Sequence, residues 1–210
     1  MISNNERLDK VYMAKNHKEL MEAYKNWACD YDNDTVCKFG YVAHIEGAKA
    51  LMEVVKNKSA LILDAGCGTG LVGQELKNNG YKNIDALDYS KEMLEEAGKK
   101  GVYGKLIHAD LSRPLKIKTN QYDAVVCTGT FTFGHVKADA FNELVRITKP
   151  GGAICFTIRE GAYEAYGYRK RMIDLESKNE WELSTMVNTD YLKNENVMCK
   201  LCTYIVREYI

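Results

Sequence analysis

The stretch over residues 60–70, which reads Ala-Leu-Ile-Leu-Asp-Ala-Gly-Cys-Gly-Thr-Gly, constrains the fold of this chain most strongly. The four apolar residues at its start predict a strand that is buried on both faces, as in a parallel sheet. Three alternating glycines follow, and they allow a turn too tight for side chains. The helical period of residues 71–79, ended by Gly80, predicts a helix after the turn. This order predicts an open α/β sheet with a ligand site at the junction.

Two classes of ligand fit such a turn. Residues 68–73 satisfy the G-x-G-x-x-G pattern of dinucleotide-binding folds, and Asp88 lies at about the spacing of the ribose-binding acid. Asp64, however, places a carboxylate beside the turn, where it would repel a pyrophosphate and attract a cation. S-adenosylmethionine carries an ammonium and a sulfonium and no phosphate. The sequence therefore favours S-adenosylmethionine and keeps NAD(P) as the alternative.

Four segments resemble, in order, the class I S-adenosylmethionine-dependent methyltransferases: residues 63–70, 86–90, 109–111 and 149–152. The resemblance covers about residues 60–158. It implies an α/β fold with a doubly wound, seven-stranded, mostly parallel sheet and an antiparallel C-terminal edge hairpin. It also implies S-adenosyl-L-methionine as cofactor and S-adenosyl-L-homocysteine as product.

The resemblance also assigns cofactor contacts. Asp64 and the glycines would hold the amino-acid end, Asp88 the ribose, and Met93 and Asp110 the adenine. Met93 can alternatively pack in the core, and Asp110 can alternatively cap the turn over residues 112–114. Ser90 is expected to cap a helix over residues 91–99. The full expected set is Tyr31, Tyr41, Asp64, Ala65, Gly66, Gly68, Gly70, Leu71, Asp88, Tyr89, Ser90, Met93, Ala109, Asp110, Leu111, Thr128 and Gly129.

Length and composition favour one globular domain over residues 1–210, because 46% of the residues are hydrophobic. The 29 basic and 29 acidic residues balance without a long basic run, so no nucleic-acid partner is expected. No membrane-spanning or secretory segment is recognisable. Seven scattered cysteines favour reduced thiols and a cytoplasmic location. The C-x-x-C of residues 199–202 has no second ligand pair, so no metal site is expected.

Residues 1–45 are expected to form a helical lid. Apolar and aromatic residues recur at helical spacing and predict two amphipathic helices, with Leu8 and Tyr12 in the first and Tyr24, Trp27 and Tyr31 in the second. Residues 27–34 resemble the W-A-x-x-Y-D-x-D segment that closes over the cofactor in many small-molecule methyltransferases. Closure would exclude water from the reacting sulfonium. The alternative is that these aromatic residues only pack on the core.

The acceptor side is expected after a fourth strand over residues 122–127. Cys-Thr-Gly-Thr follows there in place of the Asn-Pro-Pro-Tyr-like tetrad of enzymes that methylate adenine or glutamine nitrogen. Phe133 and His135 would then face the methyl group, with His135 as general base or, alternatively, as the start of a helix over residues 137–147. Arg159 and Tyr163 begin a segment, residues 159–180, that is expected to cover the substrate.

The sequence thus predicts a methyltransferase that acts on oxygen, nitrogen or sulfur of a small molecule by in-line displacement. An NAD(P)-dependent oxidoreductase and a non-catalytic cofactor-binding scaffold are the alternatives. Residues 129–136 and the Trp-Ala…Tyr-Asp segment also resemble the methyltransferase-like proteins of the Williams–Beuren region. Neither the acceptor molecule nor the oligomeric state follows from the sequence.

Overall fold

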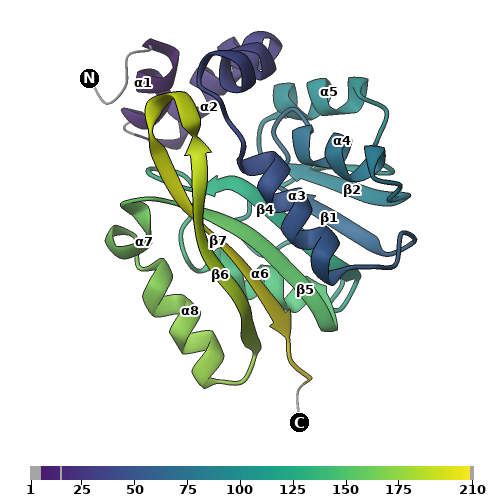
Figure 1. Cartoon of the computed structure of the whole chain (residues 1–210). Helices are drawn as coiled ribbons and strands as arrows, with labels where there is room; N and C mark the ends of the chain where they lie inside the picture. The colour runs from purple at the N-terminus through teal and green to yellow at the C-terminus, as the bar shows by residue number, and fades with distance from the viewer. Residues whose placement is uncertain (1–5, 15, 209–210) are drawn as a thin grey trace.

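Seven strands form one sheet in the computed structural model, which describes residues 6–14 and 16–208. Their order is β3-β2-β1-β4-β5-β7-β6, and β7 is the one strand that runs in the direction opposite to the other six (Figure 1). The expected fold, including the antiparallel C-terminal hairpin, is therefore confirmed. The strands are β1 (Leu61–Ala65), β2 (Asn83–Asp88), β3 (Leu106–His108), β4 (Tyr122–Phe131), β5 (Thr148–Arg159), β6 (Trp181–Leu192) and β7 (Val197–Val206).

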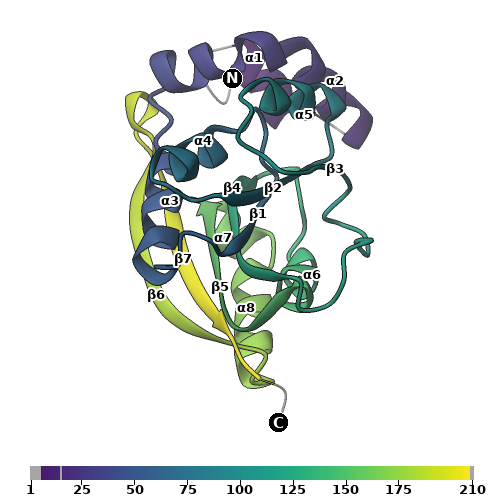
Figure 2. The same cartoon turned by 90° about the vertical axis from the view of Figure 1, so that its right-hand side faces the viewer.

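Helices cover both faces of the sheet because its central strands are apolar on both sides (Figure 2). Ile62 packs with residues of α3 and α4, whereas its neighbour Leu63 packs with residues of α6 and α8. One face carries α3 (Ala43–Val54), α4 (Leu71–Asn78) and α5 (Lys91–Lys99). The other carries α6 (Ala140–Ile147), α7 (Ala162–Ala165) and α8 (Tyr168–Ser177).

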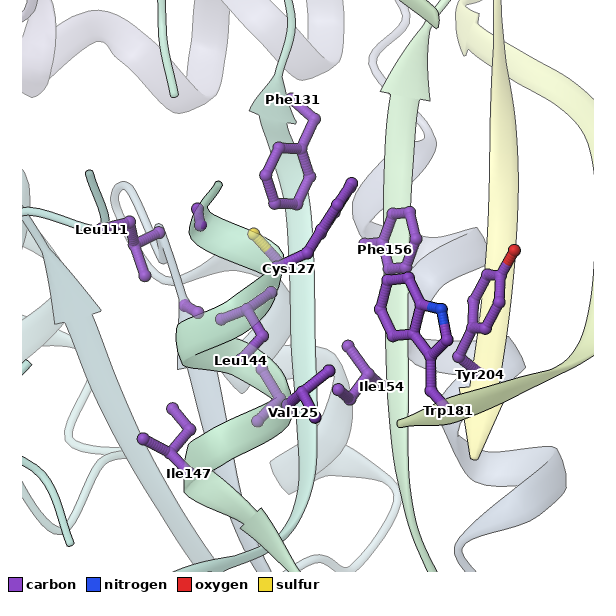
Figure 3. Packing of buried hydrophobic residues seen from close by; sticks show 14 of the residues in the cluster. Leu111, Val125, Cys127, Phe131, Leu144, Ile147, Ile154, Phe156, Trp181 and Tyr204 are labelled. Atoms are coloured by element: carbon purple, nitrogen blue, oxygen red, sulfur yellow. The ribbon is translucent and has the colours of Figure 1, made fainter. Parts of the chain in front are cut away.

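Aromatic side chains anchor the C-terminal hairpin to the parallel part of the sheet. Phe156 on β5 stacks on Trp181 and Tyr204, which lie on β6 and β7, and the last two rings are 4.1 Å apart (Figure 3). All three side chains are buried, so this cluster contributes a large part of the apolar area that folding removes from water. The cluster holds the hairpin in place beside the ends of β4 and β5.

The N-terminal segment packs on the far end of that hairpin. Its helices are α1 (Glu6–Tyr12) and α2 (His17–Trp27), and they share a small core with Tyr191 and Leu192 of β6. The Asn16 side chain caps α2 by accepting a hydrogen bond from the Glu19 amide. A 3-10 turn over Ala28–Asp30 and a π-helix over Asn33–Lys38 then lead to α3.

The two N-terminal helices were expected, but extending the second one to Tyr31 was wrong because α2 ends at Trp27. The indole of Trp27 donates to the buried carboxylate of Asp34 at 2.9 Å, and Arg7 and Lys38 neutralise that carboxylate. These contacts favour the irregular turns that follow α2. The expected packing of the Leu8 and Tyr12 side chains lies outside the described residues.

Several boundaries also differ from the sequence predictions. The sequence predicts a third strand over residues 103–108, but β3 begins at Leu106, because the Tyr103 side chain turns toward β1. The sixth helix begins at Ala140 rather than residue 137. The sequence predicts a turn over residues 149–152 before the fifth strand. Strand β5 already begins at Thr148, and these residues lie where its pairing with β4 is irregular. The sequence predicts a last strand over residues 197–209, and β7 ends at Val206. Residue 209 lies outside the described residues.

Candidate functional site

A cavity lies beside the ends of β1, β2 and β4, under the N-terminal segment, and with the solvent at its mouth it holds about 930 Å³ of empty space. Its walls come from the glycine turn, the residues after β2 and β3, the end of β4 and the lid. Most of the expected cofactor and acceptor residues therefore meet there. Those that line it are Tyr31, Tyr41, Gly66, Gly68, Leu71, Asp88, Tyr89, Met93, Ala109, Asp110, Leu111, Thr128, Gly129 and His135.

The glycine turn follows β1 with a backbone that side chains would not tolerate. Gly66 has φ +72°, and a Cβ atom on it would lie 2.1 Å from the Thr130 hydroxyl oxygen. Gly68 has φ +54° and open space where its Cβ atom would be. Both conformations are in the left-handed region that favours glycine. The turn thus brings bare backbone to the cavity wall.

Asp88 ends β2 and fixes the turn from the neighbouring strand. Its carboxylate accepts hydrogen bonds of 2.8 Å from the amides of Gly68 and Ser90. Burial raises the pKa of Asp88, and these amide donors oppose that shift. Each carboxylate oxygen has a second lone pair, and Asp88 lines the cavity, so it can accept hydrogen bonds from two ligand hydroxyls.

Asp64 lies behind the turn, outside the cavity lining, and is fully buried. Its Oδ2 atom accepts a hydrogen bond of 2.6 Å from the Tyr103 hydroxyl, whereas Oδ1 has no hydrogen-bond partner among the described residues. Burial raises the pKa of Asp64 to about 7, and the Tyr103 hydrogen bond opposes the shift. Tyr103 carried no motif that would have identified it from sequence.

The residues after β2 and β3 form the other end of the cavity. Ser90 caps α5 as expected, because its hydroxyl accepts a hydrogen bond from the Met93 amide. Ser90 does not line the cavity, and neither do Ala65 and Gly70. The buried Met93 side chain does line it. Asp110 Oδ1 accepts from the Ser112 amide at 2.8 Å, which is the turn-capping role considered from the sequence. Asp110 also lines the cavity, and its Oδ2 atom lies 3.5 Å from Nε of Arg113, which is outside the lining.

Asp32 ties the N-terminal segment to the glycine turn and to the end of α5. The Thr69 hydroxyl donates to one carboxylate oxygen of Asp32, and Lys100 pairs with the other at 2.6 Å. His44, in the first turn of α3, also lines the cavity and stacks on the Tyr41 ring. Burial lowers the pKa of His44 to about 4. Asp32 was predictable only as part of the Trp-Ala…Tyr-Asp motif, and His44 and Thr69 were not predicted as site residues.

His135 lies between two partners with opposite hydrogen-bonding roles. Its Nδ1 atom is 2.7 Å from the Phe133 carbonyl oxygen, which can only accept, so Nδ1 carries the proton in the neutral ring. Its Nε2 atom is 2.6 Å from the Tyr24 hydroxyl and then accepts from it. The Nε2 lone pair therefore points to the part of the wall that Tyr24 provides. Tyr24 was expected only as a helix residue.

Three expected acceptor residues lie elsewhere. Arg159 has its guanidinium carbon 5.0 Å from the centre of the Phe133 ring, and Lys200 has its ammonium 5.0 Å from the centre of the Tyr163 ring. Phe133, Arg159 and Tyr163 do not line the cavity. Segment 159–180, which contains α7 and α8, packs on the sheet core instead, so the cavity lining does not support its expected role as a substrate cover.

The charges at the cavity discriminate between ligand classes. Two carboxylates, Asp88 and Asp110, line it, and no lysine or arginine among the described residues does so. The Asp88 carboxylate would repel a pyrophosphate, whereas it would attract a cation. Buried His44 Nδ1 also has no hydrogen-bond partner within the described chain and could bind a ligand hydrogen. The site therefore fits a cationic, phosphate-free, hydroxyl-bearing cofactor such as S-adenosylmethionine.

The described residues contain neither a membrane-spanning helix nor a metal-binding cluster. In residues 6–14 and 16–208 no helix combines the length and the apolar character that crossing a bilayer requires. Over the same part of the chain, no group of three or more His, Cys, Asp or Glu side chains is arranged to hold a metal ion.

Comparison with known proteins supports the same class. Residues 63–156 match the methyltransferase domain family. Human Methyltransferase-like protein 27 is 40% identical over 144 residues, which are 67% of this chain and 58% of that protein. A malonyl-[acyl-carrier protein] O-methyltransferase from Buchnera aphidicola is 32% identical over 158 residues, 75% of this chain and 61% of the relative. The chain thus spans about three fifths of the length of these two proteins.

Solved structures share the fold. A putative S-adenosyl-L-methionine-dependent methyltransferase from Methanococcus maripaludis has a TM-score of 0.64 at 21% identity, with 89% of this chain and 94% of the other covered. The fold, the glycine turn and the matched family define a class I S-adenosylmethionine-dependent methyltransferase domain. Within that class the chain is similar to Methyltransferase-like protein 27, as its resemblance to methyltransferase-like proteins predicted. S-adenosylmethionine is the cofactor of this class.

Proposed function

We propose that this protein transfers a methyl group from S-adenosylmethionine to oxygen, nitrogen or sulfur of a small molecule. The observation that carries the proposal is the charge of the cavity lining. Asp88, Asp110 and His135 line the cavity, and no lysine or arginine of the described chain does so. Bound S-adenosylmethionine supplies an electrophilic methyl group on a sulfonium. Negative side chains around the cavity attract that cation, and His135 can take the proton of the acceptor.

The proposed roles follow from the atoms that each residue presents. Asp88 accepts hydrogen bonds from the ribose hydroxyls, because its carboxylate is already oriented by two backbone amides. Met93 and Asp110 contact the adenine from the far wall, the first by its thioether and the second by its carboxylate. Asp64 adds negative charge from behind the glycine turn when it is ionised, above its pKa of about 7. The lid residues Tyr31 and Tyr41 exclude water from the reacting atoms.

The alternative functions receive less support. In a dinucleotide-binding site the third glycine of G-x-G-x-x-G allows close packing of helix on strand, whereas Gly73 makes room for the Tyr103 ring, from which its Cβ atom would be 2.3 Å away. A malonyl-carrier acceptor, named for several relatives, is a carboxylate. The cavity has no described cation to receive it. A non-catalytic scaffold would bind cofactor without turnover. The cytoplasmic location and the lack of a nucleic-acid partner stay predictions.

Calorimetric titration of the full chain tests the proposal. We expect S-adenosylmethionine and S-adenosylhomocysteine to bind and NAD⁺ not to bind. Asp88→Ala should weaken both cofactor affinities roughly 10- to 100-fold, because each hydrogen bond to a charged group contributes about 1.5–3 kcal/mol. Glu53→Ala, on the exposed part of α3, is the matched control and should leave binding unchanged. Preference for NAD⁺, or no binding of either adenosyl compound, would overturn the proposal.

A further inference from the structure

A second cavity adjoins the cofactor cavity, between the lid and the end of the β6–β7 hairpin. Its empty space, counted together with the solvent at its open side, is about 400 Å³. Tyr24, Tyr31, Tyr41, Gly129 and His135 line both cavities. The second cavity is therefore reached from the place where His135 would meet the acceptor. We call it the aromatic chamber.

Its walls are aromatic and uncharged. Six rings line the aromatic chamber: Tyr24, Trp27, Tyr31, Phe39, Tyr41 and Tyr191. No charged side chain does so in the described part of the chain, and the neighbouring Asp34 is already paired with Arg7 and Lys38. A charged ligand would lose its hydration without gaining an ion pair. The walls therefore favour a neutral, planar ligand.

Thr132 gives the aromatic chamber an unused hydrogen-bonding group. Its side chain lines the chamber and is 3% exposed, and its hydroxyl oxygen has no hydrogen-bond partner among the described residues. Leaving a buried hydroxyl in this state destabilises the protein unless a partner accepts a hydrogen bond from it or donates one to it. A ligand with a hydroxyl group would do so. The chamber thus pairs aromatic walls with one polar contact beside His135.

The cofactor itself argues against a cationic acceptor. A sulfonium in the first cavity would repel an ammonium group a few ångströms away. A protonated amine also has no lone pair with which to attack a methyl group. The aromatic rings could contact a cation, but these two effects oppose its binding next to the methyl donor. A neutral hydroxyl group on an aromatic ring meets neither objection.

We propose that the aromatic chamber binds the methyl acceptor and that this acceptor is an uncharged, single-ring phenol; this inference rests on the proposed function. Thr132 and Tyr24 contact the phenol oxygen. As the new carbon–oxygen bond forms and the carbon–sulfur bond breaks, the phenol proton passes to Tyr24, whose own proton passes to Nε2 of His135. The sulfonium charge is lost and an imidazolium gains it, so charge balances. The imidazolium then releases its proton to solvent.

Binding of small probes in the presence of saturating S-adenosylhomocysteine tests this assignment without turnover. We expect an NMR titration of the full chain to show phenol binding more tightly than benzoate, benzylammonium or toluene. Thr132→Val should weaken phenol binding roughly 3- to 10-fold, the loss expected for one hydrogen bond, and leave toluene binding unchanged. Thr132→Ser keeps the hydroxyl and should retain phenol affinity. Thr185→Val, on the exposed face of β6, is the matched control.

The possible outcomes separate the two proposals. Formation of anisole from phenol and S-adenosylmethionine, together with the expected binding order, would support the acceptor class. Tighter binding of benzoate or benzylammonium would overturn it, and so would equal phenol affinity in Thr132→Val and the intact chain. Binding of S-adenosylhomocysteine without any binding of phenol would overturn the chamber assignment and leave the proposed function standing. Failure of S-adenosylhomocysteine to bind would overturn both.

Discussion

Tyr103 donates a hydrogen bond of 2.6 Å to Asp64 across 39 residues of sequence, and the absence of a side chain at Gly73 makes room for its ring. The contact places the hydroxyl of an otherwise ordinary loop tyrosine against the carboxylate that ends β1. Because Asp64 is fully buried, this donor partly replaces the water that the carboxylate has lost. Gly73 therefore allows the Tyr103 ring to pack against α4.

Tyr103→Phe is expected to destabilise the fold most strongly where Asp64 is ionised. Loss of the hydroxyl leaves Oδ2 of the buried carboxylate without its donor, which costs about 1–3 kcal/mol. The cost should be smaller about two pH units below the Asp64 pKa of about 7 than about two units above it, because the neutral carboxyl is easier to bury. Urea denaturation at the two pH values measures the difference.

Tyr81→Phe provides the control for that measurement. Tyr81 is also buried, but its hydroxyl donates to the backbone carbonyl of Val55, which does not titrate. Its loss should therefore lower the free energy of unfolding by a similar amount at both pH values. Equal pH dependence in the Tyr81→Phe and Tyr103→Phe variants would contradict the role assigned to the Tyr103–Asp64 pair.

Asp64 and His44 are expected to give the free energy of unfolding opposite pH dependences. Burial raises the pKa of Asp64 to about 7, so the folded state retains a proton that the unfolded state releases, and this contribution falls as pH rises from about 4 to about 7. Burial lowers the pKa of His44 to about 4, so the unfolded state binds the extra proton, and this contribution rises from about pH 4 to about pH 6.5. In the intact protein the two largely cancel.

Single substitutions should expose each slope. Relative to the intact chain, Asp64→Asn should gain stability as pH rises from about 4 to about 6.5, because only the His44 contribution remains. His44→Phe should lose stability over the same range. Each change is on the order of 3 kcal/mol, at about 1.36 kcal/mol per unit of pKa shift. Denaturation midpoints across this range decide the matter, and parallel curves for the three proteins would refute the assignment.

The order of strands and the position of the cofactor cavity were predictable from the sequence because both depend on local signals. The apolar run before Asp64 and the glycines after it specify a buried strand and a tight turn, and the capped helix after Ser90 begins and ends as predicted. Asp88 was predictable as well, since the acid at the end of the second strand meets the turn in any sheet with this topology.

Contacts between distant segments were not predictable in the same way. Tyr103 reaches Asp64 only because Gly73 leaves a gap, and no local pattern records that gap. The partnership of Tyr24 and His135 joins residues 111 positions apart, from the lid and from the loop after β4. Arg159 was predicted near the acceptor from its position at the end of a strand, and its contact with Phe133 was not predictable from that position.

Gly47→Ala is expected to destabilise the protein through one contact between α3 and β4. A Cβ atom on Gly47 would lie 2.3 Å from Cγ2 of Thr128, and such overpacking typically costs about 1–3 kcal/mol. Thr128→Ser removes that methyl group and keeps the hydroxyl. In this background the alanine should become neutral or stabilising, since alanine favours a helix over glycine by about 1 kcal/mol. A double-mutant cycle from thermal denaturation measures the coupling, and additive effects would contradict the predicted clash.

His135 is expected to be in the Nδ1–H tautomer when neutral, because the Phe133 carbonyl 2.7 Å from Nδ1 can only accept a hydrogen bond. This tautomer leaves the Nε2 lone pair toward Tyr24, as a general base requires. Nitrogen-15 NMR of the imidazole distinguishes the two tautomers directly. Tyr24→Phe should preserve the Nδ1–H form, because the Phe133 carbonyl fixes it, but should slow methyl transfer to a hydroxyl acceptor. Observation of the Nε2–H form in the intact protein would remove His135 as the base, since the nitrogen facing Tyr24 would already carry its proton.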